Sequence, residues 1–498
     1  MSEESSLKSS FSIPQRLDQP STEIRNFFLN IFDVPPCTAQ LEDEVFWIVR
    51  DLQSNSIIGA IAAVFQRYGQ SDYQECYTLQ VGISSECRGQ EIGSSLLKAM
   101  EQEARQRECI QVRMRTFQDW NLVLDLIEKH GWLRSKARPS ERYNFVEEDW
   151  ILPLPKRPIQ VILVGANPNG RGGEWAKAIE RQSQLASLTG VVDCSQESLK
   201  HWEAKGLPAA ADIDDLLEKL DTKPDAAVLA LPHSEYSRAR EACFRHKLAM
   251  LHEKPLGTSL QELIELKEKL ETTPVPLIVG VQRRAHPAYI YLHHIVTEKM
   301  NDRLPETVYV RLALGHSPSP SPPKEQDLQG AGKRWRDDPR QARGGGLIDL
   351  GYHAIDLVHF ILDSPLDVTF CSLWKGDSPA FSDEIDDRAV IVGRCGSAWV
   401  RIDVDRFGAS KEEYMILNFP NMQIRATRDS VEVDGKEQYS CKKSWIKAEE
   451  GVVARLAIAP GEPDSLEFWN YYAVMRVIES AKGLAAKAGF KREDFENE

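Results

Sequence analysis

The order of hydrophobic and polar positions divides the chain into three regions. From about Phe46 to Val146, the apolar positions indicate the order strand, strand, helix, strand, helix, strand. From Ile159 to about Val281, apolar segments such as IQVILVG, AAVLAL and LIVGV alternate with helical segments, which is typical of βαβ units around a parallel sheet. After Arg284, segments such as VYVRLAL, RAVIVGR and SAWVRIDV indicate an antiparallel sheet.

These regions predict an α/β and α+β protein with three domains, because 498 residues are too many for one core. The domains are expected over residues 21–150 (α+β), 159–282 (a Rossmann dinucleotide-binding domain) and 283–498 (an open-faced, mostly antiparallel β-sheet). Residues 1–20 are expected to form a disordered tail, and the Pro-rich residues 151–158 a semi-rigid linker. By composition, residues 316–330 (HSPSPSPPKEQDLQG) form a loop.

Within the third region, the glycines Gly344–Gly346 lead into a helix with a polar stripe. Asp349, His353, Asp356 and Phe360 recur at i, i+4, i+7 and i+11, which places them on one helix face. The opposite stripe is apolar and would pack on a core: Leu350, Ala354, Leu357, Val358 and Ile361. Carboxylates and an imidazole in register suit proton transfer at a pocket. Taken alone, the pattern fits a surface helix with a polar face equally well.

The first strand of the parallel region runs into a glycine-rich turn and then a helix. Backbone N–H groups and the positive end of a helix dipole can bind a pyrophosphate there. The pattern G-x-G-x-x-G becomes Gly165-x-Asn167-x-x-Gly170, and asparagine tolerates the positive φ of such a turn. At the end of the second strand, Asp193 could bind the ribose hydroxyls and repel a 2′-phosphate, which favours NAD over NADP. The alternative is an ordinary βα turn that binds nothing.

A second candidate is the triplet Glu253-Lys254-Pro255, which follows a predicted strand. Pro255 restricts Lys254 to extended backbone dihedrals. A lysine there would stand over the open end of a parallel sheet, where such folds bind ligands. The triplet is common in proteins, so its meaning depends on the surrounding motifs.

Taken in order, the motifs VILVGANPNGRG, VVD, ALPHSEY, HEKPLGTS, VGVQRRAHP, WRDDP and GGGLIDLGYHAIDLVHFIL resemble those of the Gfo/Idh/MocA oxidoreductases, from about residue 157 to the end of the chain. The resemblance implies an enzyme that moves hydride between NAD(P) and a sugar, nucleotide-sugar or polyol carbon. It implies Lys254, Asp349 and His353 as catalytic residues. The cofactor contacts are expected from Gly165, Asn167, Asn169, Gly170, Asp193, Pro232, Glu253 and Lys254. Many members have Asn and His where this chain has His233 and Tyr236.

The chemistry of alcohol oxidation fits these residue types. His353, with an ordinary pKa near ~6.5, is the natural general base for the hydroxyl proton. Lys254 would stabilise the developing alkoxide, and Asp349 would hold the hydroxyl or orient the imidazole. A sensor that binds NAD without turnover is a further alternative, although it has no need for all three side chains.

In the first region, a strand ending at Ile83, a turn with Gly89 and an amphipathic helix would again form an anion cradle. The segment resembles motif A of the GNAT N-acetyltransferases, over about residues 20–150, and implies an acetyl-CoA site. Its residues would be Val81, Arg88, Gly89, Gly93 and Ser94.

Two departures from the GNAT motifs keep its activity open. Glu91 replaces a glycine beside the expected pyrophosphate position, and Ile127 stands near the usual place of a tyrosine acid. Acetyl transfer would then use Glu75 as the base for the amine, and solvent or Tyr143 as the acid. The alternatives are a bifunctional enzyme and an oxidoreductase with a non-catalytic GNAT-like domain that regulates it or recruits a partner.

Composition and charge limit the partners. The formal net charge is −14 and no basic block stands out, which argues against nucleic acid and anionic membranes. The nine cysteines have no C-x-x-C or metal-ligand spacing, so we expect reduced thiols, a cytoplasmic location and no metal site. The polar start does not resemble a signal peptide, and the longest apolar stretch, Ile57–Phe65, is far short of the ~20 residues that cross a bilayer.

The β-sheet domain is expected to leave one sheet face uncovered. We therefore predict a homo-oligomer, a dimer or tetramer, that buries this face. Trp399 and Trp445 are expected to pack inside the domain. The substrate is expected to be a small molecule whose identity no motif encodes.

Overall fold

The computed structural model describes residues 11–19, 21–32, 44–67, 73–117, 121–139, 146–299, 303–315, 335–380, 384–441, 448–458 and 465–487. The chain forms two compact units, Met1–Lys156 and Arg157–Glu498. The expected loop at 316–330 and the expected packing of Trp445 lie outside the described residues.

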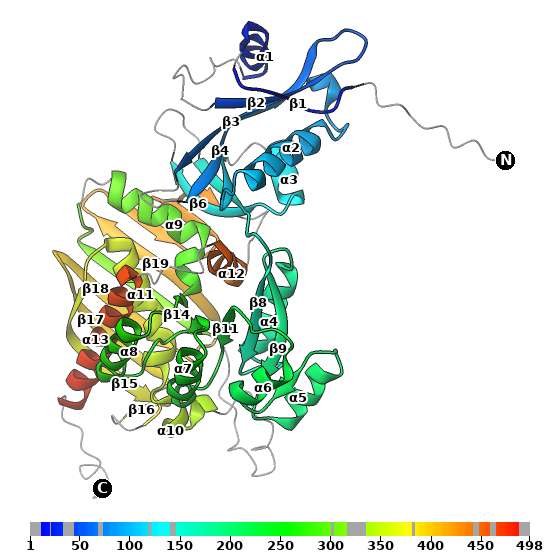
Figure 1. Ribbon diagram of the computed structural model, residues 1–498. Helices are drawn as coiled ribbons and strands as arrows, with labels where there is room; N and C mark the ends of the chain where they lie inside the picture. Colours follow the sequence, from blue (N-terminus) through cyan, green and yellow to red (C-terminus); the bar gives the residue numbers. More distant parts are fainter. Residues whose placement is uncertain are drawn as a thin grey trace, which may run out of the picture. The chain divides into compact units, whose positions relative to one another are not determined.

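The N-terminal unit is an α+β fold around one mixed sheet with the strand order β1-β2-β3-β4-β5-β7-β6 (Figure 1). Its strands are β1 (Gln15–Leu17), β2 (Glu44–Arg50), β3 (Ile57–Arg67), β4 (Gln74–Ile83), β5 (Gln111–Phe117), β6 (Leu133–Pro139) and β7 (Val146–Pro153). Its helices are α1 (Thr22–Phe32), η1 (Ser85–Cys87), α2 (Ile92–Gln106) and α3 (Asn121–Lys129). Separate apolar clusters hold α2 and α1 to the sheet, as the apolar runs of β2 and β3 require.

Two segments expected to be irregular belong to this sheet. Gln15–Leu17 pair with β2, because Leu17 joins the apolar cluster under α1, so the expected tail 1–20 is wrong over these residues. Ile151–Pro153 complete β7 and pair with β5, since Trp150 and Leu152 alternate into the core. The expected linker 151–158 is therefore wrong over its first residues.

The C-terminal unit begins with an all-parallel sheet of order β10-β9-β8-β11-β12-β13. Numbered along the chain this is 3-2-1-4-5-6, the Rossmann order. The strands are β8 (Ile159–Val164), β9 (Ala186–Val192), β10 (Ala209–Ala210), β11 (Ala226–Leu229), β12 (Ala249–Glu253) and β13 (Leu277–Gly280). The helices are α4 (Arg171–Arg181), α5 (Gln196–Glu203), α6 (Ile213–Lys219), η2 (His233–Glu235), α7 (Tyr236–Arg245) and α8 (Leu260–Thr272).

The rest of this unit is a larger sheet of order β16-β15-β17-β18-β14-β19-β20-β21-β22, in which β14 and β18 run parallel and the other described pairs are antiparallel. Its strands are β14 (Thr307–Leu314), β15 (Leu366–Lys375), β16 (Ser378–Pro379), β17 (Arg388–Cys395), β18 (Ala398–Asp405), β19 (Lys411–Phe419), β20 (Met422–Ala426), β21 (Ser430–Val433) and β22 (Lys436–Ser440). The fold class expected from the sequence is confirmed.

Helices cover one face of this sheet, with α13 and α11 drawn across its strands (Figure 1). The helical elements are η3 (Gln282–Ala285), α9 (Pro287–His294), η4 (Ile295–Lys299), η6 (Trp335–Asp337), α10 (Pro339–Ala342), η7 (Leu347–Gly351), α11 (Tyr352–Leu362), α12 (Ala448–Ile458) and α13 (Ser465–Lys487). On the other face Trp399 is 47% exposed, so its expected packing in a core is wrong. The alternation of β18 directs Trp399 away from the helices, while Val400 points toward them and is buried.

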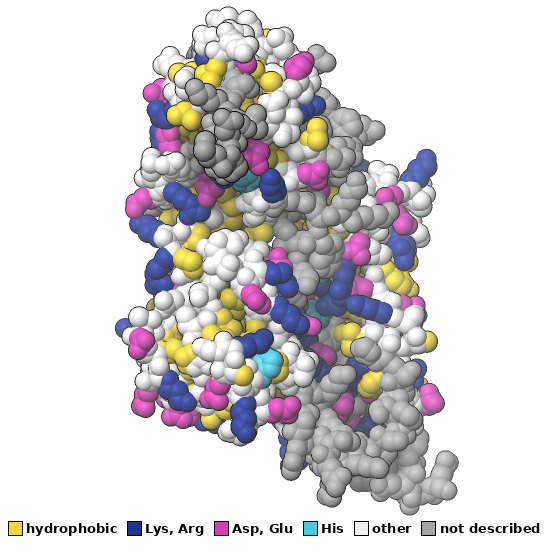
Figure 2. All heavy atoms as spheres, turned by 90° about the vertical axis from the view of Figure 1, so that its right-hand side faces the viewer, with side chains coloured by type: hydrophobic (Ala, Val, Ile, Leu, Met, Phe, Trp, Pro, Cys, Tyr) yellow, Lys and Arg dark blue, Asp and Glu magenta, His cyan; other side chains and the backbone are white. Residues whose placement is uncertain are grey.

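The apolar helices and the surface charges both bear on the expected partners. Among the described residues, Pro339–Leu362 is long and apolar enough to cross a membrane, and 83% of its most apolar window is buried inside the structure. Core helices of globular proteins share this property. Acidic and basic side chains are interspersed over the face that Figure 2 presents.

Candidate active site

The strand order of the parallel sheet reverses between β8 and β11, and open parallel sheets form their ligand-binding crevice at such a point. Open parallel sheets bind ligands at the carboxyl ends of the strands that flank such a point. Gly165 follows β8 directly, and Pro232 lies just after β11. Gly165 has φ +85°, and a Cβ atom there would overlap the backbone carbonyl of Ala230. The turn therefore requires glycine at this position.

The close approach of α4 to this turn depends on two glycines that the sequence pattern did not single out. A Cβ on Gly172 would overlap the carbonyl oxygen of Gly165, and a Cβ on Gly173 would overlap that of Pro168. Gly170 is the N-cap of α4, and a Cβ there would make only ordinary contacts. The paired glycines at the start of a helix were the available signal for this packing.

The two asparagines and Asp193 hold the turn together. The Asn167 side chain accepts a hydrogen bond from the Asn169 backbone N–H (2.9 Å), and the Asn167 carbonyl accepts from Gly170 N–H (3.1 Å). Asp193 follows β9, and its carboxylate accepts from Ser195 N–H (2.8 Å). Burial raises the pKa of Asp193, partly opposed by its backbone hydrogen bonds. Asp193 therefore lies at the crevice, with its carboxylate partly used by the turn.

A dinucleotide fits this arrangement. The N-terminus of α4 has no side-chain cap, and the glycines allow a phosphate to approach its backbone N–H groups closely. Arg171, in the first turn of α4, binds Glu253 through its Nε atom and Glu174 through Nη1 (2.5 Å). Glu253 also accepts from Trp175 Nε1 (2.9 Å). In this structure, Glu253 thus fixes the first turns of α4 to the end of β12.

Lys254 and Asp349, 95 positions apart in the sequence, meet at the end of β12. The Lys254 Nζ atom donates to Asp349 Oδ1 (2.5 Å) and to the Asp349 backbone carbonyl (2.8 Å). Arg336 Nε lies 3.4 Å from Asp349 Oδ2. Burial lowers the pKa of Lys254, and the Asp349 charge acts against this shift. Burial would raise the pKa of Asp349, but Lys254 and Arg336 outweigh it and hold that pKa below its ordinary value.

His353 lies four residues after Asp349 and is 5% exposed. Its Nδ1 atom is buried and has no hydrogen-bond partner among the described residues. Burial lowers the pKa of His353 well below its usual range, and the positive charges of Arg283 and Lys254 act in the same direction. The imidazole is therefore neutral near pH 7 and able to accept a proton.

The helix that carries these residues differs from the regular α-helix expected. Asp349 lies in η7, a π-helical turn, and the α-helix starts only at Tyr352. Single π turns often occur at functional sites. Asp356 is fully buried and bound by Arg284 Nε (2.8 Å), so the polar stripe faces the interior rather than solvent. The alternative of a surface helix is excluded.

A buried carboxylate outside the predicted set holds the glycine run before this helix. Asp386 accepts hydrogen bonds from Gly345 N–H (3.0 Å) and Leu347 N–H (2.7 Å) through its side chain. Its backbone carbonyl accepts from Gly346 N–H (2.7 Å). A Cβ on Gly345 would overlap the Asp386 backbone. The glycines therefore allow close packing and are not merely flexible.

His233 and Tyr236, the two departures from the family pattern, form an aromatic wall near Lys254. The His233 Nδ1 atom donates to the Ala342 carbonyl (2.6 Å), and Trp335 meets the His233 ring edge-on at 4.8 Å. Burial lowers the pKa of His233 to about 4, with the charge of Lys254 adding to it. Tyr236 packs against the His252 ring at 4.0 Å.

In the N-terminal unit, β4 and β5 pair in parallel only from Glu75 to Thr78 on β4. Beyond Thr78, β4 runs on to Ile83 without pairing to β5. Val81 lies in this continuation, and Gly93 and Ser94 lie in the first turn of α2. Arg88 and Gly89 (φ +80°) form the exposed turn between them. The five predicted acetyl-CoA residues therefore border one end of α2.

The structure shows the surroundings of Glu91 and Ile127, which differ from the GNAT motifs, and of the candidate base Glu75. Glu91 adopts left-handed dihedrals, and its exposed carboxylate lies 3.8 Å from Lys129 Nζ. Ile127 is buried in the core. Glu75 accepts from Gln66 (2.7 Å), Gln111 (2.8 Å) and Arg113 (2.9 Å), which leaves little capacity for a base. The other candidate, Tyr143, lies outside the described residues.

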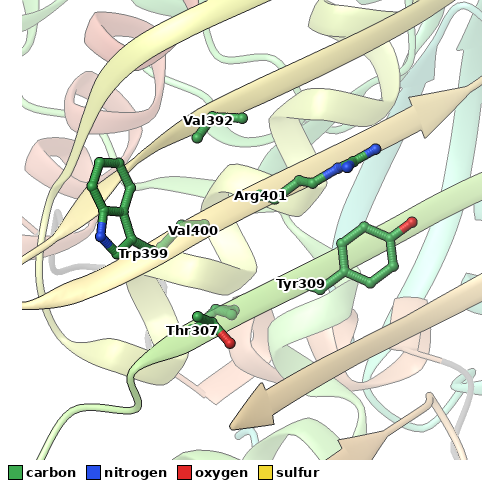
Figure 3. A pocket seen from close by; sticks show the side chains of 7 residues that line it. Thr307, Tyr309, Val392, Trp399, Val400 and Arg401 are labelled. Atoms are coloured by element: carbon green, nitrogen blue, oxygen red, sulfur yellow. The ribbon is translucent and has the colours of Figure 1, made fainter.

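A hollow of about 410 Å³ lies elsewhere, on the uncovered face of the large sheet. Figure 3 shows Thr307, Tyr309, Trp399 and Arg401 on the neighbouring strands β14 and β18 around it. None of the predicted catalytic or cofactor-binding residues lines it. Among the described residues, no group of His, Cys, Asp and Glu could hold a metal ion.

Lys254, at the end of a strand of the Rossmann sheet, thus meets Asp349 of the segment that follows this sheet in the chain. Residues 159–281 match the model of the oxidoreductase family with an NAD-binding Rossmann fold, and residues 308–437 match the GFO/IDH/MocA C-terminal domain. The chain belongs to the Gfo/Idh/MocA oxidoreductases. Residues 10–132 match the GNAT acetyltransferase family.

Two curated relatives are similar in sequence. Glucose-6-phosphate 3-dehydrogenase from Bacillus subtilis is 27% identical over 187 residues, 36% of this chain and 47% of the relative. Inositol 2-dehydrogenase from Mycolicibacterium smegmatis is 33% identical over 131 residues, 26% of this chain and 38% of the relative. The chain thus spans less than half the length of either relative.

A solved structure shows the same fold. The WlbA dehydrogenase from Bordetella pertussis, in complex with NADH and UDP-GlcNAcA, is 19% identical with a TM-score of 0.53. The similarity covers 68% of this chain and 98% of that protein. The family and fold expected from the sequence are confirmed for both units.

Proposed function

We propose that residues 157–498 transfer hydride between a nicotinamide cofactor and a hydroxyl-bearing carbon of a sugar, nucleotide sugar or polyol. The observation that carries the proposal is the bond from Lys254 Nζ to Asp349 Oδ1 (2.5 Å), beside a buried neutral His353. Lys254 follows β12, a strand of the parallel sheet, and such sheets bind dinucleotides at the carboxyl ends of their strands. NAD supplies the hydride acceptor when bound.

The side chains divide the remaining work. His353 accepts the substrate hydroxyl proton, because burial keeps its imidazole neutral near neutral pH. Lys254 donates a hydrogen bond to the oxygen on which negative charge develops. Asp349 holds Lys254 through two contacts and so sets the direction of the ammonium group. In ketone reduction His353 returns the proton.

The function is tested by following absorbance at 340 nm while the full-length protein is incubated with NAD and a panel of sugars, nucleotide sugars and polyols. We expect NADH to form with at least one compound. Lys254→Met abolishes this signal, whereas Arg245→Gln, a change at an exposed arginine on α7, does not. Absence of turnover across the panel, together with tight NAD binding, would favour a sensor instead.

We propose NAD rather than NADP as the preferred cofactor. Asp193 follows β9 at the crevice and carries a carboxylate that would repel a 2′-phosphate. Titration of the protein with each dinucleotide compares the two affinities. Asp193→Ser should narrow the difference between them, and equal affinities in the unchanged protein would contradict the preference.

For the N-terminal unit, we propose that acetyl-CoA binds at the start of α2. Transfer of the acetyl group to an amine is a second, more specific proposal for the same site. The opening between β4 and β5 after Thr78 and the uncapped N-terminus of α2 support binding. The three donors on Glu75 favour binding without catalysis. The oxidoreductase would then be regulated by, or recruited through, this unit.

Calorimetric titration with acetyl-CoA tests whether the N-terminal unit binds this cofactor. We expect heat of binding in the unchanged protein and none in Gly89→Glu, because Gly89 has φ +80° in the turn before α2 and the substitution adds a carboxylate where the pyrophosphate would bind. Release of free CoA in the presence of an amino sugar would establish transfer. No heat in the unchanged protein contradicts acetyl-CoA binding.

We also propose that the uncovered sheet face pairs with a second copy of the chain. Arg401 and Asp403 of this face bind each other within the chain at 2.9 Å, so the charges there are paired before a second copy arrives. Trp399 and Phe370 are about half exposed there and add apolar area.

A further inference from the structure

Arg240, on α7, is a buried arginine whose hydrogen bonds reach the segment that carries Lys254. Its side chain is almost fully buried, at 4% exposed. The Nη1 atom donates to the Leu256 carbonyl (2.6 Å) and lies 3.4 Å from His252 Nε2. His252 comes two residues before Lys254, and Leu256 comes two residues after it. One guanidinium group therefore holds the chain on both sides of Lys254.

The imidazole of His252 fits this contact in only one tautomer. Its Nδ1 atom bonds to the Glu253 carbonyl, which can only accept, so Nδ1 carries the hydrogen and Nε2 is the acceptor for Arg240. Burial lowers the pKa of His252 well below its usual range, and the charge of Arg240 acts in the same direction. The ring is therefore neutral near pH 7, and it passes the hold of Arg240 on to the backbone next to Lys254.

The other arm of the guanidinium group reaches the start of α8. Arg240 Nη2 donates to Glu262 Oε1 (2.5 Å). Glu262 Oε2 accepts from the Thr258 backbone N–H (2.8 Å) and from the Thr258 hydroxyl (3.0 Å). Burial would raise the pKa of Glu262, but the bonds from Thr258 and the charge of Arg240 outweigh it and lower that pKa. The carboxylate is therefore charged, and residues 252–258 are tied to one buried cation.

Packing alone does not explain a charged side chain at this place. Removing a guanidinium group from water is costly, and an apolar side chain would hold α7 to the sheet without that cost. A guanidinium group differs because its donors lie in one plane at fixed angles, so it specifies where its acceptors lie. Lys254 needs such precision, since its Nζ atom binds Asp349 Oδ1 at 2.5 Å. A displacement of about 1 Å at a reacting centre can reduce turnover by roughly 10²-fold.

Resting on the proposed oxidoreductase function, we propose that Arg240 is a positioning residue for Lys254. It fixes the path of residues 252–258 and thereby the point at which the Lys254 ammonium group meets Asp349 and the reacting oxygen. Its own bonds go to this segment and to the start of α8, so it acts through Lys254 and not on the substrate.

The first test measures the protection of Lys254 in the full-length protein, independently of turnover. The protein is treated briefly with acetic anhydride, and mass spectrometry of its peptides gives the rate at which each lysine is acetylated. Lys254 is 11% exposed in its side chain and bonded to Asp349, so it should react slowly. Arg240→Met should raise this rate roughly tenfold, the equivalent of one lost hydrogen bond to a charged group. Lys482, a partly buried lysine of the same unit, should react at an unchanged rate.

Two further variants are matched to Arg240→Met. Arg245→Gln removes an exposed arginine at the end of the same helix and should leave Lys254 protected. Arg240→Lys keeps a charge beside Glu262 but lacks the planar fork, so it should raise the rate by a smaller factor. It carries the test if Arg240→Met does not fold, and thermal melting establishes which variants are folded.

The second test uses any compound that reduces NAD. Arg240→Met should lower kcat by at least about tenfold. It should also move the alkaline fall of kcat/KM to higher pH, because Lys254 loses part of the burial that lowers its pKa. A mere loss of stability would leave this pH profile in place. A Lys254 acetylation rate that does not rise, or an unchanged kcat, overturns the positioning role. If acetylation of Lys254 depends on Arg240 but no compound reduces NAD, the proposed oxidoreductase function fails while the positioning of Lys254 stands.

Discussion

Lys254, Asp349 and His353 could be named from the sequence because each sits in a short motif of residues with distinctive chemistry. Their protonation could not be named, because it depends on burial and on partners distant in the sequence. Arg336, Arg283 and Arg428 all change the local charge, and no local pattern connects them to the glycine-led helix. The sequence likewise gave no sign that the carboxylate of Asp356 is buried against Arg284.

Removing either proposed catalytic side chain should reduce turnover with little effect on folding. We expect His353→Ala to lower kcat by roughly 10²–10⁴-fold, the usual contribution of a general base. Lys254→Met should have an effect of at least that size, since it removes the proposed donor to the reacting oxygen and leaves Asp349 with only the more distant Arg336 as a cation partner among the described residues. Steady-state kinetics and thermal melting measure the two properties. Near-normal turnover in both variants would contradict the catalytic roles proposed for Lys254 and His353.

The pH profile of kcat/KM should be displaced toward acid. Oxidation needs a neutral His353, and burial lowers its pKa well below 6.5, so activity should persist into mildly acidic solution. It also needs a charged Lys254, and burial lowers that pKa below 10.5, so the alkaline fall should come early. A fall of kcat/KM on the acidic side near the ordinary histidine pKa of ~6.5 would contradict a buried His353 with a lowered pKa.

At the scale of elements, hydrophobic patterning gave the strands and most helices, because burial on one or both faces leaves a clear period in the sequence. It failed where a few residues join a sheet edge, as Gln15–Leu17 do, because three residues are too few to show a period. It also failed to show the π turn at Leu347–Gly351. Packing of Gly345 and Gly346 against Asp386 accompanies that turn.

The glycine-led helix should depend on Asp386. Asp386→Ala leaves two buried backbone N–H groups without their acceptor, so we expect a loss of about 2–4 kcal/mol in the free energy of unfolding. Asp386→Asn keeps one acceptor oxygen and should lose less. Urea unfolding measures both. Glu384→Ala, a change at a partly exposed neighbour, is the control. An Asp386→Ala protein as stable as this control would contradict the role.

At the scale of the whole chain, charge and cysteine spacing argued against several partner classes, and motif order indicated two families. Which face of the large sheet stays uncovered follows from the tertiary structure, because the helices pack on the other face. The exposure of Trp399 could not be predicted from the sequence, because tryptophans are usually buried and only the register of β18 directs this one outward. The same register creates the hollow that it lines with Tyr309 and Arg401 (Figure 3).

If this face joins two copies, a charge in its middle should separate them. We expect Trp399→Glu to shift the protein toward the monomer in analytical ultracentrifugation, because an unpaired carboxylate would be buried at the contact. Ile264→Glu alters another exposed apolar side chain, on α8, and should not change the mass. A monomeric unchanged protein, or an oligomer indifferent to Trp399→Glu, would contradict the contact.

The sequence by itself determined the two families, the alternation of strands and helices in the Rossmann domain and the residue types at the proposed catalytic centre, since these follow from local periodicity and from motifs a few residues long. Tertiary structure decided which groups are charged, which glycines are sterically required and which sheet face stays open. It brought Lys254 to Asp349 across 95 positions and placed Arg283 and Arg428 around Glu413. Such long-range pairings depend on the closed fold, because no single segment contains both partners.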